Sequence, residues 1–552
     1  MHYSRTLSVL VPVMSILLAA GTDPAPGGTR RHDVADSEYT SLAAETAYDA
    51  VGMISTSSIL ASGVLVAENY VLTAAHVGEV GGSMTFALPS GGYVRAWEVI
   101  HPGWTGDLAD GTDLALIRLD TLVLDELPAE LYTEADEVGQ TGVLVGFGRT
   151  GTGLDGATEP AGTKRAGENV WDLSGASFGD SDDLLLADFD NPSRSRDNWF
   201  GRPRAISLEY CIAPGDSGGG MFLDDGGVQK LAGVVSFIAW RDSEGDSDYG
   251  DAMGVVRISR HLDWLTTGLS AAYTMTWVGV SGGFNIAENW QTTFGGQTVN
   301  SVPGSLDTVR FDAIGSHVVT WPAADLANTR LSIVAGDVTL DLSGQTYALT
   351  GTGLSQPSLV VGEAGQSGQA LTILNGTLST QHAFLGPDVG SDVSMTVGAG
   401  ATWNAGGSVY VGGTDGSSGG TARLIVDDAE VNIAGELVVW SGGVLELANG
   451  IVDVSYLTLA GGTLSGTGTV IGDVVVIAGV ISPGGDFGEG ETVTDSVYYW
   501  PVGVSATPEP ASVTVLCMGA VVLLRRRRTG RGIRRGSVPA SRCDPVGHPE
   551  EP

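Results

Sequence analysis

Three short segments of the chain carry side chains that could together cleave a peptide bond. They are Val71–His76, which ends in a histidine, Thr112–Leu119, which begins Thr-Asp, and Pro214–Gly219, which reads Pro-Gly-Asp-Ser-Gly-Gly. A serine hydroxyl is a weak nucleophile at neutral pH and needs a base within hydrogen-bond reach. Histidine can take that proton and return it to the leaving amine. A buried carboxylate can hold the imidazole in the required tautomer. Each segment alone also has a purely structural explanation, as a buried histidine or a glycine turn.

Taken together, in the order His, Asp, Ser, the three segments resemble the trypsin/chymotrypsin-like serine peptidases. The resemblance covers residues 50–268 and is specific because three separate motifs agree. It implies that Ser217 is the nucleophile, that His76 is the general base and acid, and that Asp113 is the orienting carboxylate. It also implies a protein or peptide substrate and an acyl-enzyme mechanism without a cofactor.

Other acidic residues near the second motif leave alternatives open. Asp107 and Asp110 compete for the third catalytic role, but only Asp113 directly precedes an apolar strand-like run. The stretch around these residues, and residues 181–183, could offer oxygen ligands to Ca²⁺. Neither follows a recognised loop spacing, and acidic loops are usually solvated. We therefore expect no metal site.

The same resemblance suggests an oxyanion hole and a substrate pocket. The amides of Gly215 and Ser217 occupy the positions that bind the oxyanion, and glycine lets the backbone turn there. Cys211 stands where relatives have the floor of the primary pocket, and Ser236 and Ile238 stand on its wall. A cysteine offers no counter-ion for Arg or Lys, and Ile238 would narrow the pocket. We expect cleavage after small or medium apolar residues.

Activation is left open by the sequence. Relatives form a new N-terminal amine that pairs with the aspartate before the nucleophile, here Asp216. The usual Ile-Val-Gly-Gly start is absent, and Arg30–Arg31 is a candidate processing point. The alternative is that Asp216 is satisfied by local hydrogen bonds and that no cleavage is needed.

The peptidase-like half, residues 31–269, is predicted to be all-β. Short apolar runs separated by glycine turns favour antiparallel strands, and residues 257–269 have helical spacing. The resemblance implies a trypsin-like double β-barrel.

Residues 273–486 have a different texture, rich in Gly, Thr, Ser, Val and Leu. Marker glycines at 362, 386 and 412 are spaced by 24 and 26 residues, which predicts stacked β-solenoid coils. A Gly/Ser linker would lack the periodic Val, Leu and Ile. The region, including Ile481–Gly484, resembles the passenger-like repeats of autotransporter-type and PEP-CTERM surface proteins. The resemblance implies a right-handed parallel β-helix.

The two ends of the chain carry targeting patterns. Residues 1–21 read as a secretory signal peptide. After a linker at 487–506, residues 507–528 combine Thr-Pro-Glu-Pro, a short apolar run and four arginines, and a basic tail follows at 529–552. Residues 507–528 resemble the PEP-CTERM sorting signal, which implies an exosortase-type sorting machinery and transient contact with the membrane. A plain tail anchor is the alternative. We expect an exported protein at the bacterial surface, in the outer membrane or outside the cell.

Composition excludes one class of function and narrows another. The 552 residues include 64 acidic and 27 basic side chains, a formal charge of −37, which excludes a general nucleic-acid binder. The three cysteines, Cys211, Cys517 and Cys543, provide no disulfide framework within the peptidase-like half. The leading hypothesis is a secreted serine endopeptidase. The alternative is an adhesive or structural surface solenoid with a vestigial peptidase domain.

Overall fold

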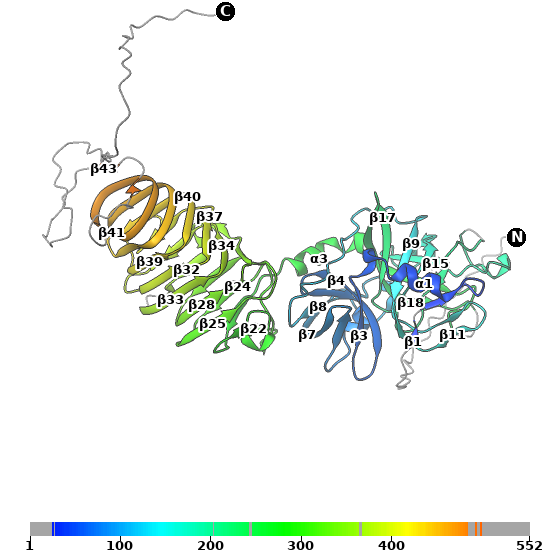
Figure 1. Ribbon diagram of the computed structural model, residues 1–552. Helices are drawn as coiled ribbons and strands as arrows, with labels where there is room; N and C mark the ends of the chain where they lie inside the picture. The colour runs from blue at the N-terminus through cyan, green and yellow to red at the C-terminus, as the bar shows by residue number, and fades with distance from the viewer. Residues whose placement is uncertain are drawn as a thin grey trace, which may run out of the picture.

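The computed structural model describes residues 25–26, 28–201, 204–241, 246–363, 367–483, 492–493 and 497–499. It is nearly all β, with a closed barrel and a seven-stranded sheet followed by a β-solenoid (Figure 1). The predicted signal peptide, sorting segment and basic tail lie outside the described residues and stay predictions. Within the described ranges, no helix combines the length and hydropathy that a membrane crossing needs.

The first sheet is a closed barrel in the order β3-β4-β5-β8-β7-β6. The apolar side chains of its strands point into a core that includes Ile54, Val64, Leu72 and Leu116, all less than 1% exposed. Closure leaves no unpaired strand edge. The strands are β3 (Val51–Ser55), β4 (Leu60–Ala67), β5 (Tyr70–Thr73), β6 (Thr85–Leu88), β7 (Gly91–Ile100) and β8 (Ala115–Leu119).

The second sheet has seven strands in the order β13-β9-β17-β18-β19-β15-β14. It packs around buried Leu144, Trp171 and Val255. Beside it lies a four-stranded sheet, β11-β10-β2-β16. The strands are β9 (Thr141–Gly146), β13 (Arg165–Val170), β14 (Leu173–Ser174), β15 (Leu184–Asp188), β17 (Gly220–Asp225), β18 (Val228–Ala239), β19 (Ala252–Arg257), β2 (Gly28–Arg30), β10 (Thr150–Thr152), β11 (Gly156–Glu159) and β16 (Tyr210–Cys211).

The edges of this unit differ slightly from those predicted. Strand β2 pairs with β10 and β16, so the folded unit already includes Gly28–Arg30. Helix α1 (Asp36–Ala43) packs against β13. The C-terminal helix α3 covers only Leu262–Leu269. The predicted helix began at Arg257, but that residue ends strand β19, where it is buried and bonds to Glu137.

The solenoid stacks its strands in three parallel ladders, one for each face of the coil. Along one ladder, Leu331, Leu359, Ala383, Val409 and Leu437 stand in register, and each is fully buried. One coil could not bury this face alone, so stacking supplies the core. The first ladder contains β20 (Thr274–Trp277), β24 (Thr308–Phe311), β27 (Arg330–Ile333), β32 (Leu359–Val361), β35 (Ala383–Leu385) and β38 (Val409–Val411).

The other two ladders complete the coils. The second contains β25 (Ser316–Thr320), β28 (Asp337–Asp341), β33 (Ser367–Leu374), β36 (Asp392–Val397) and β39 (Thr421–Asp427). The third contains β26 (Leu326–Asn328), β29 (Thr346–Leu349), β34 (Gly376–Thr380) and β37 (Ala401–Ala405). The long strands β40 (Glu430–Trp440) and β41 (Gly443–Pro483) continue more than one face.

The marker glycines found in the sequence turn the chain at one corner of this stack. Gly362, Gly386 and Gly412 directly follow β32, β35 and β38 and have φ of 97°, 62° and 79°. Residues with a side chain rarely adopt such a φ, so glycine is favoured there. Each donates its amide to the carbonyl one coil earlier at 2.8–2.9 Å. The predicted repeat of about 25 residues is therefore a structural repeat.

The solenoid begins directly against the closed barrel. Trp97 of β7 belongs to the same apolar core as the first coils and stacks on Phe294, with ring centroids 5.0 Å apart. The Asn285 side chain accepts from the Leu122 amide at 2.9 Å and donates to its carbonyl. The Val302 amide donates to the Asp120 carbonyl at 2.8 Å. These contacts join the two units through both apolar packing and backbone hydrogen bonds.

A buried ion pair lies in this junction. Arg118 of β8 donates to Asp307 of the solenoid at 2.6 Å, and both side chains are at most 2% exposed. The guanidinium also lies over the rings of Tyr70, Trp97 and Tyr273 at 5.1–5.7 Å from their centroids. Removing either partner would leave a buried charge uncompensated.

The catalytic candidates and the solenoid occupy opposite ends of two paired strands. In β5 and β8, Tyr70 pairs with Arg118 at the end that meets the solenoid. At the other end Thr73 pairs with Ala115. His76 follows Thr73 in the chain, and Asp113 precedes Ala115. The solenoid therefore does not cover the candidate catalytic end.

Candidate active site

His76 is held by a short helix at the end of a barrel strand. Helix α2 (Ala75–Gly78) follows β5 and puts His76 at its second residue. The His76 amide donates to Asp113 Oδ1 at 3.0 Å, and the ring Nδ1 lies 2.8 Å from Asp113 Oδ2. A carboxylate only accepts hydrogen bonds, so Nδ1 carries the proton and Nε2 is left as the base. Two bonds to one carboxylate fix both the backbone and the ring.

Asp113 itself is fully buried and has a third donor. The Ser236 hydroxyl of β18 donates to Asp113 Oδ2 at 2.6 Å. The competing carboxyls lie elsewhere: Asp107 Oδ1 accepts from the Ala109 amide and Asp110 Oδ2 from the Thr105 hydroxyl, and both aspartates are exposed. The structure thus brings Asp113, and neither rival, to His76. It also places the Ser236 hydroxyl on Asp113, whereas the sequence suggested only a place on the pocket wall.

Ser217 lies in the turn before β17 and is hydrogen-bonded to β4, the neighbour of the strand β5 that leads to His76. The Ser62 amide donates to the Ser217 carbonyl at 2.9 Å, and the Gly218 amide donates to the Val235 carbonyl at 2.8 Å. Gly218 has a φ of 80°, and a Cβ there would collide with Thr73, three residues before His76. Within the described residues, no hydrogen bond joins Ser217 to His76. Such catalytic bonds often tighten only when substrate binds.

The backbone around Ser217 leaves two amides available. The amides of Asp216, Gly218 and Gly219 donate to carbonyls at 2.7–2.9 Å. Those of Gly215 and Ser217 have no acceptor among the described residues. Gly215 has a φ of 104°. The Pro214 carbonyl, which shares a peptide with the Gly215 amide, accepts from the Arg149 amide at 2.8 Å, and the Asp216 carbonyl, which shares a peptide with the Ser217 amide, accepts from Gly219 at 2.7 Å. Two oriented, unused amides beside a serine match the geometry that an oxyanion needs.

Asp216 is satisfied by backbone amides. Its carboxylate accepts from the Gly148 amide at 2.7 Å and from the Ala213 amide at 2.8 Å. Complete burial raises the pKa of Asp216 to about 7, although these bonds act in the opposite direction. Both side chains of the candidate processing point Arg30–Arg31 are hydrogen-bonded: Arg30 donates to Asp36 and Arg31 donates to the Ile206 carbonyl.

The other pocket candidates are placed as follows. Cys211 ends β16 as a free, fully buried thiol, and burial raises its pKa well above the usual range. Ile238 of β18 pairs with Met253 of β19, and Met253 is fully buried. The sequence did not single out Met253, because its position opposite Ile238 depends on strand register. Nor did it single out Ser62, whose amide donates to the Ser217 carbonyl and whose hydroxyl donates to the Gly215 carbonyl.

One group of carboxylates in the described part of the chain has the spacing of metal ligands. Asp246, Asp248 and Asp251 offer oxygens within 4.8 Å of one another. The acidic stretches considered in the sequence are different ones, and Asp107 and Asp110 are instead engaged in loop hydrogen bonds.

Comparison with protein-family models adds to this geometry. Residues 40–162 match the trypsin family. The trypsin-family match contains His76 and Asp113 and ends before Ser217, and it covers less than a quarter of the chain. No curated protein matches the sequence. The trypsin-family match and the barrel region together support a serine peptidase in general and imply protein substrates.

Proposed function

We propose that this protein is a serine endopeptidase in which Ser217, His76 and Asp113 form the catalytic triad. The observation that carries the proposal is the pair of hydrogen bonds that the His76 ring and amide donate to Asp113, at 2.8 and 3.0 Å. They lie beside a serine turn in which the Gly215 and Ser217 amides have no acceptor among the described residues. A purely structural histidine would not need its ring and backbone tied to one buried carboxylate.

The chemistry follows from these positions. His76 Nε2 takes the proton of Ser217 Oγ as that oxygen attacks the substrate carbonyl. The resulting oxyanion accepts from the Gly215 and Ser217 amides. Asp113, kept in place by Ser236, stabilises the imidazolium that forms. His76 then gives its proton to the leaving amine, and water repeats the sequence on the acyl-enzyme.

For specificity we propose cleavage after small or medium apolar residues. The pairing of Ile238 with Met253 supports this, because paired residues on neighbouring strands point to the same face of the sheet and a second bulky apolar side chain therefore lies beside Ile238. The buried Cys211 supplies no charge for a basic side chain. A peptide library would test this directly, and a strong preference for Arg or Lys before the cleaved bond would contradict it.

The test of catalysis is covalent labelling of the full chain with a fluorophosphonate probe. We expect stoichiometric labelling that disappears in Ser217→Ala and persists in Ser58→Ala, a substitution at an exposed serine outside the site. The kcat of Ser217→Ala on a cleavable peptide should fall on the order of 10⁶-fold. Labelling that is absent in folded protein would contradict the proposal and favour an adhesive or structural surface protein.

Export and sorting form a separate proposal. The N-terminal signal pattern and the Pro-Glu-Pro segment with its arginines support secretion to the bacterial surface through exosortase-type sorting machinery. Mass spectrometry of the mature protein from cell-surface material tests this. An intact C-terminus at Pro552 would contradict processing of the sorting segment.

A further inference from the structure

The outer face of the last coils carries an apolar patch where a solenoid normally faces water. Phe384, Tyr410 and Val438 stand in register on consecutive coils, between inward-facing neighbours. They therefore point outward, because side chains alternate along a strand. Yet each is less than 9% exposed, and they form an apolar cluster of their own with Trp440 and Ala460.

A single loop covers one side of this patch. Residues 412–420 connect β38 to β39, and a bridge between Gly413 and Ser418 closes the loop on itself. The Trp440 indole donates to the Thr414 carbonyl at 2.9 Å, which ties the ring to the loop. The coil from Tyr410 to its paired residue Val438 is 28 residues long, which leaves room for this loop. The next coil, from Val438 to its paired residue Thr458, is only 20 residues long and has no comparable covering loop.

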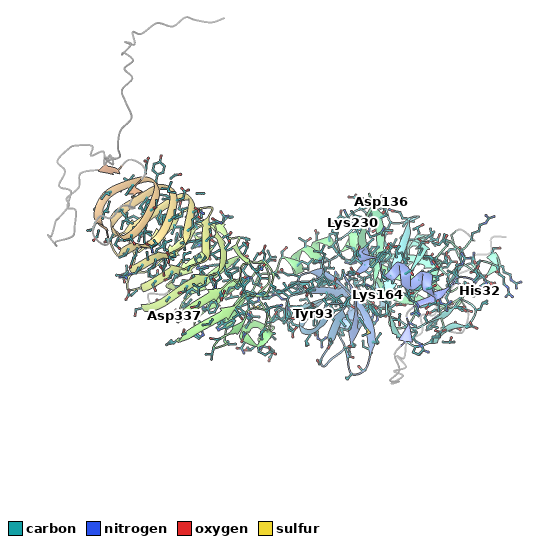
Figure 2. The ribbon with its side chains drawn as sticks, viewed as in Figure 1. His32, Tyr93, Asp136, Lys164, Lys230 and Asp337 are labelled. Atoms are coloured by element: carbon teal, nitrogen blue, oxygen red, sulfur yellow. The ribbon has the colours of Figure 1, made fainter. Side chains whose placement is uncertain are left out.

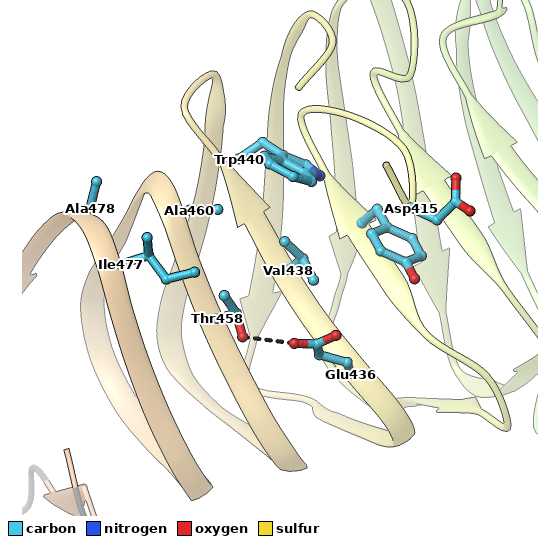
Figure 3. Close-up of a pocket in the computed structure, with 9 residues that line it drawn as sticks. Asp415, Glu436, Val438, Trp440, Thr458, Ala460, Ile477 and Ala478 are labelled. Atoms are coloured by element: carbon cyan, nitrogen blue, oxygen red, sulfur yellow. Dashed lines mark hydrogen bonds between the residues drawn. The ribbon is translucent and has the colours of Figure 1, made fainter. Parts of the chain in front are cut away.

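The result is a groove of about 430 Å³ between the loop and the last coils (Figure 3). Figure 3 shows Val438 near its middle, with Trp440 above it and Ile477 to its left. Asp415 and Glu436 stand at its rim, and both are exposed. One Glu436 oxygen accepts from the Thr458 hydroxyl at 2.8 Å, which fixes the direction of that carboxylate.

The charge around the groove is one-sided. Its lining contains two carboxylates and no basic residue. Residues 273–483 contain 17 Asp and Glu, 3 Arg and no Lys, and their charge is thus 3 − 17 = −14. The three arginines are already paired with carboxylates: Arg310 with Asp312, Arg330 with Glu363 and Arg423 with Glu446. No cation of the solenoid therefore competes for the groove.

We propose that this groove binds an arginine or lysine side chain from a basic segment of another polypeptide. Its aliphatic stem would cover Val438, its cationic group would lie against the face of Trp440 or Tyr410, and Asp415 and Glu436 would accept from it. Attraction to the acidic solenoid would also raise the rate of encounter. A neutral sugar could stack on the same rings but would make no use of the charge.

The experiment measures binding of a fluorescein-labelled Gly-Arg-Gly-Arg-Gly amide to the full chain by fluorescence anisotropy. The Ser217→Ala background prevents hydrolysis of the probe. Asp415→Asn combined with Glu436→Gln removes the two charges while keeping side-chain size. Asp337→Asn is the matched control, because Asp337 is an exposed carboxylate on β28 in the early coils (Figure 2).

We expect the charge-removing variant to bind the probe about tenfold more weakly or worse, and Asp337→Asn to bind it unchanged. Raising salt from 50 to 500 mM should weaken binding by a similar factor. Trp440→Ala should weaken it several-fold. An equal loss in Asp337→Asn would assign binding to the general acidic surface and overturn the proposal. So would unchanged binding in the charge-removing variant, or Trp440-dependent binding of a neutral hexasaccharide in place of the peptide.

Discussion

The peptidase unit (residues 28–269) and the solenoid (residues 273–483) differ in the carboxyl groups that they bury. The peptidase unit buries several carboxyls, among them Asp113, Asp188, Glu209 and Asp216. In the described residues from 273 to 483, Asp307 is the one buried carboxylate, and it is paired with Arg118 of the peptidase unit. Burying an ionisable group is costly unless it is paired or hydrogen-bonded. The difference shows that the first unit holds buried carboxyl groups through specific hydrogen bonds, whereas the solenoid repeats an apolar core.

The strongest test of this contrast is removal of the proposed catalytic base. His76→Ala should lower kcat on the order of 10⁶-fold, because Ser217 loses its proton acceptor. Steady-state kinetics on an apolar peptide measures the loss, and circular dichroism checks that the fold persists. Residual activity within tenfold of the parent would show that His76 is structural.

The next largest effect is expected at the junction of the two units. Asp307→Ala leaves the Arg118 guanidinium buried without its partner, and this should lower the free energy of unfolding by about 3–5 kcal/mol. Thermal unfolding followed by calorimetry measures the change. The double variant Arg118→Met with Asp307→Leu should recover much of the loss, since no buried charge remains. An unchanged melting profile in Asp307→Ala would mean that the two units are not coupled.

A smaller effect is expected from the hydroxyl that bonds to Asp113. A hydrogen bond to a charged group contributes about 1.5–3 kcal/mol, so Ser236→Ala should lower kcat by about tenfold or more. Ser236 acts by positioning Asp113, so the acid limb of the pH profile should shift as well. Ser236→Thr, which keeps the hydroxyl, should restore the profile. A changed KM with unchanged kcat and pH profile would instead place Ser236 in substrate binding only.

The smallest effect concerns pH and is confined to the peptidase unit. Burial raises the pKa of Glu209 to about 9 and of Asp190 to about 7, from about 4 in an unfolded chain. A raised pKa in the folded state favours folding at low pH, and this contribution is lost as pH rises through 7 and then 9. The Tm of this unit should therefore fall between pH 5 and pH 9. It should fall less in Glu209→Gln, which stays uncharged; an equal or steeper fall would contradict the assignment.

Much of this architecture can be predicted from the sequence, and what cannot depends on contacts between distant residues. The glycines at 362, 386 and 412 predict the stacked coils because the chain turns at each of them with a positive φ, which favours glycine. The preference for Asp113 over its neighbours follows from the apolar strand after it. By contrast, the Ser236–Asp113 bond spans 123 residues and the Arg118–Asp307 pair spans 189. Neither has a local signal, so only the folded chain reveals them.

The barrel that meets the first coil has a consequence for self-association. A stack of parallel coils ends in unpaired strand edges, which can add further copies end to end. Here Trp97 and Leu122 close the first edge with apolar side chains, and the Asp120 carbonyl takes up one backbone amide. The peptidase unit thus caps the first coil, so that further copies cannot add to the solenoid at this end.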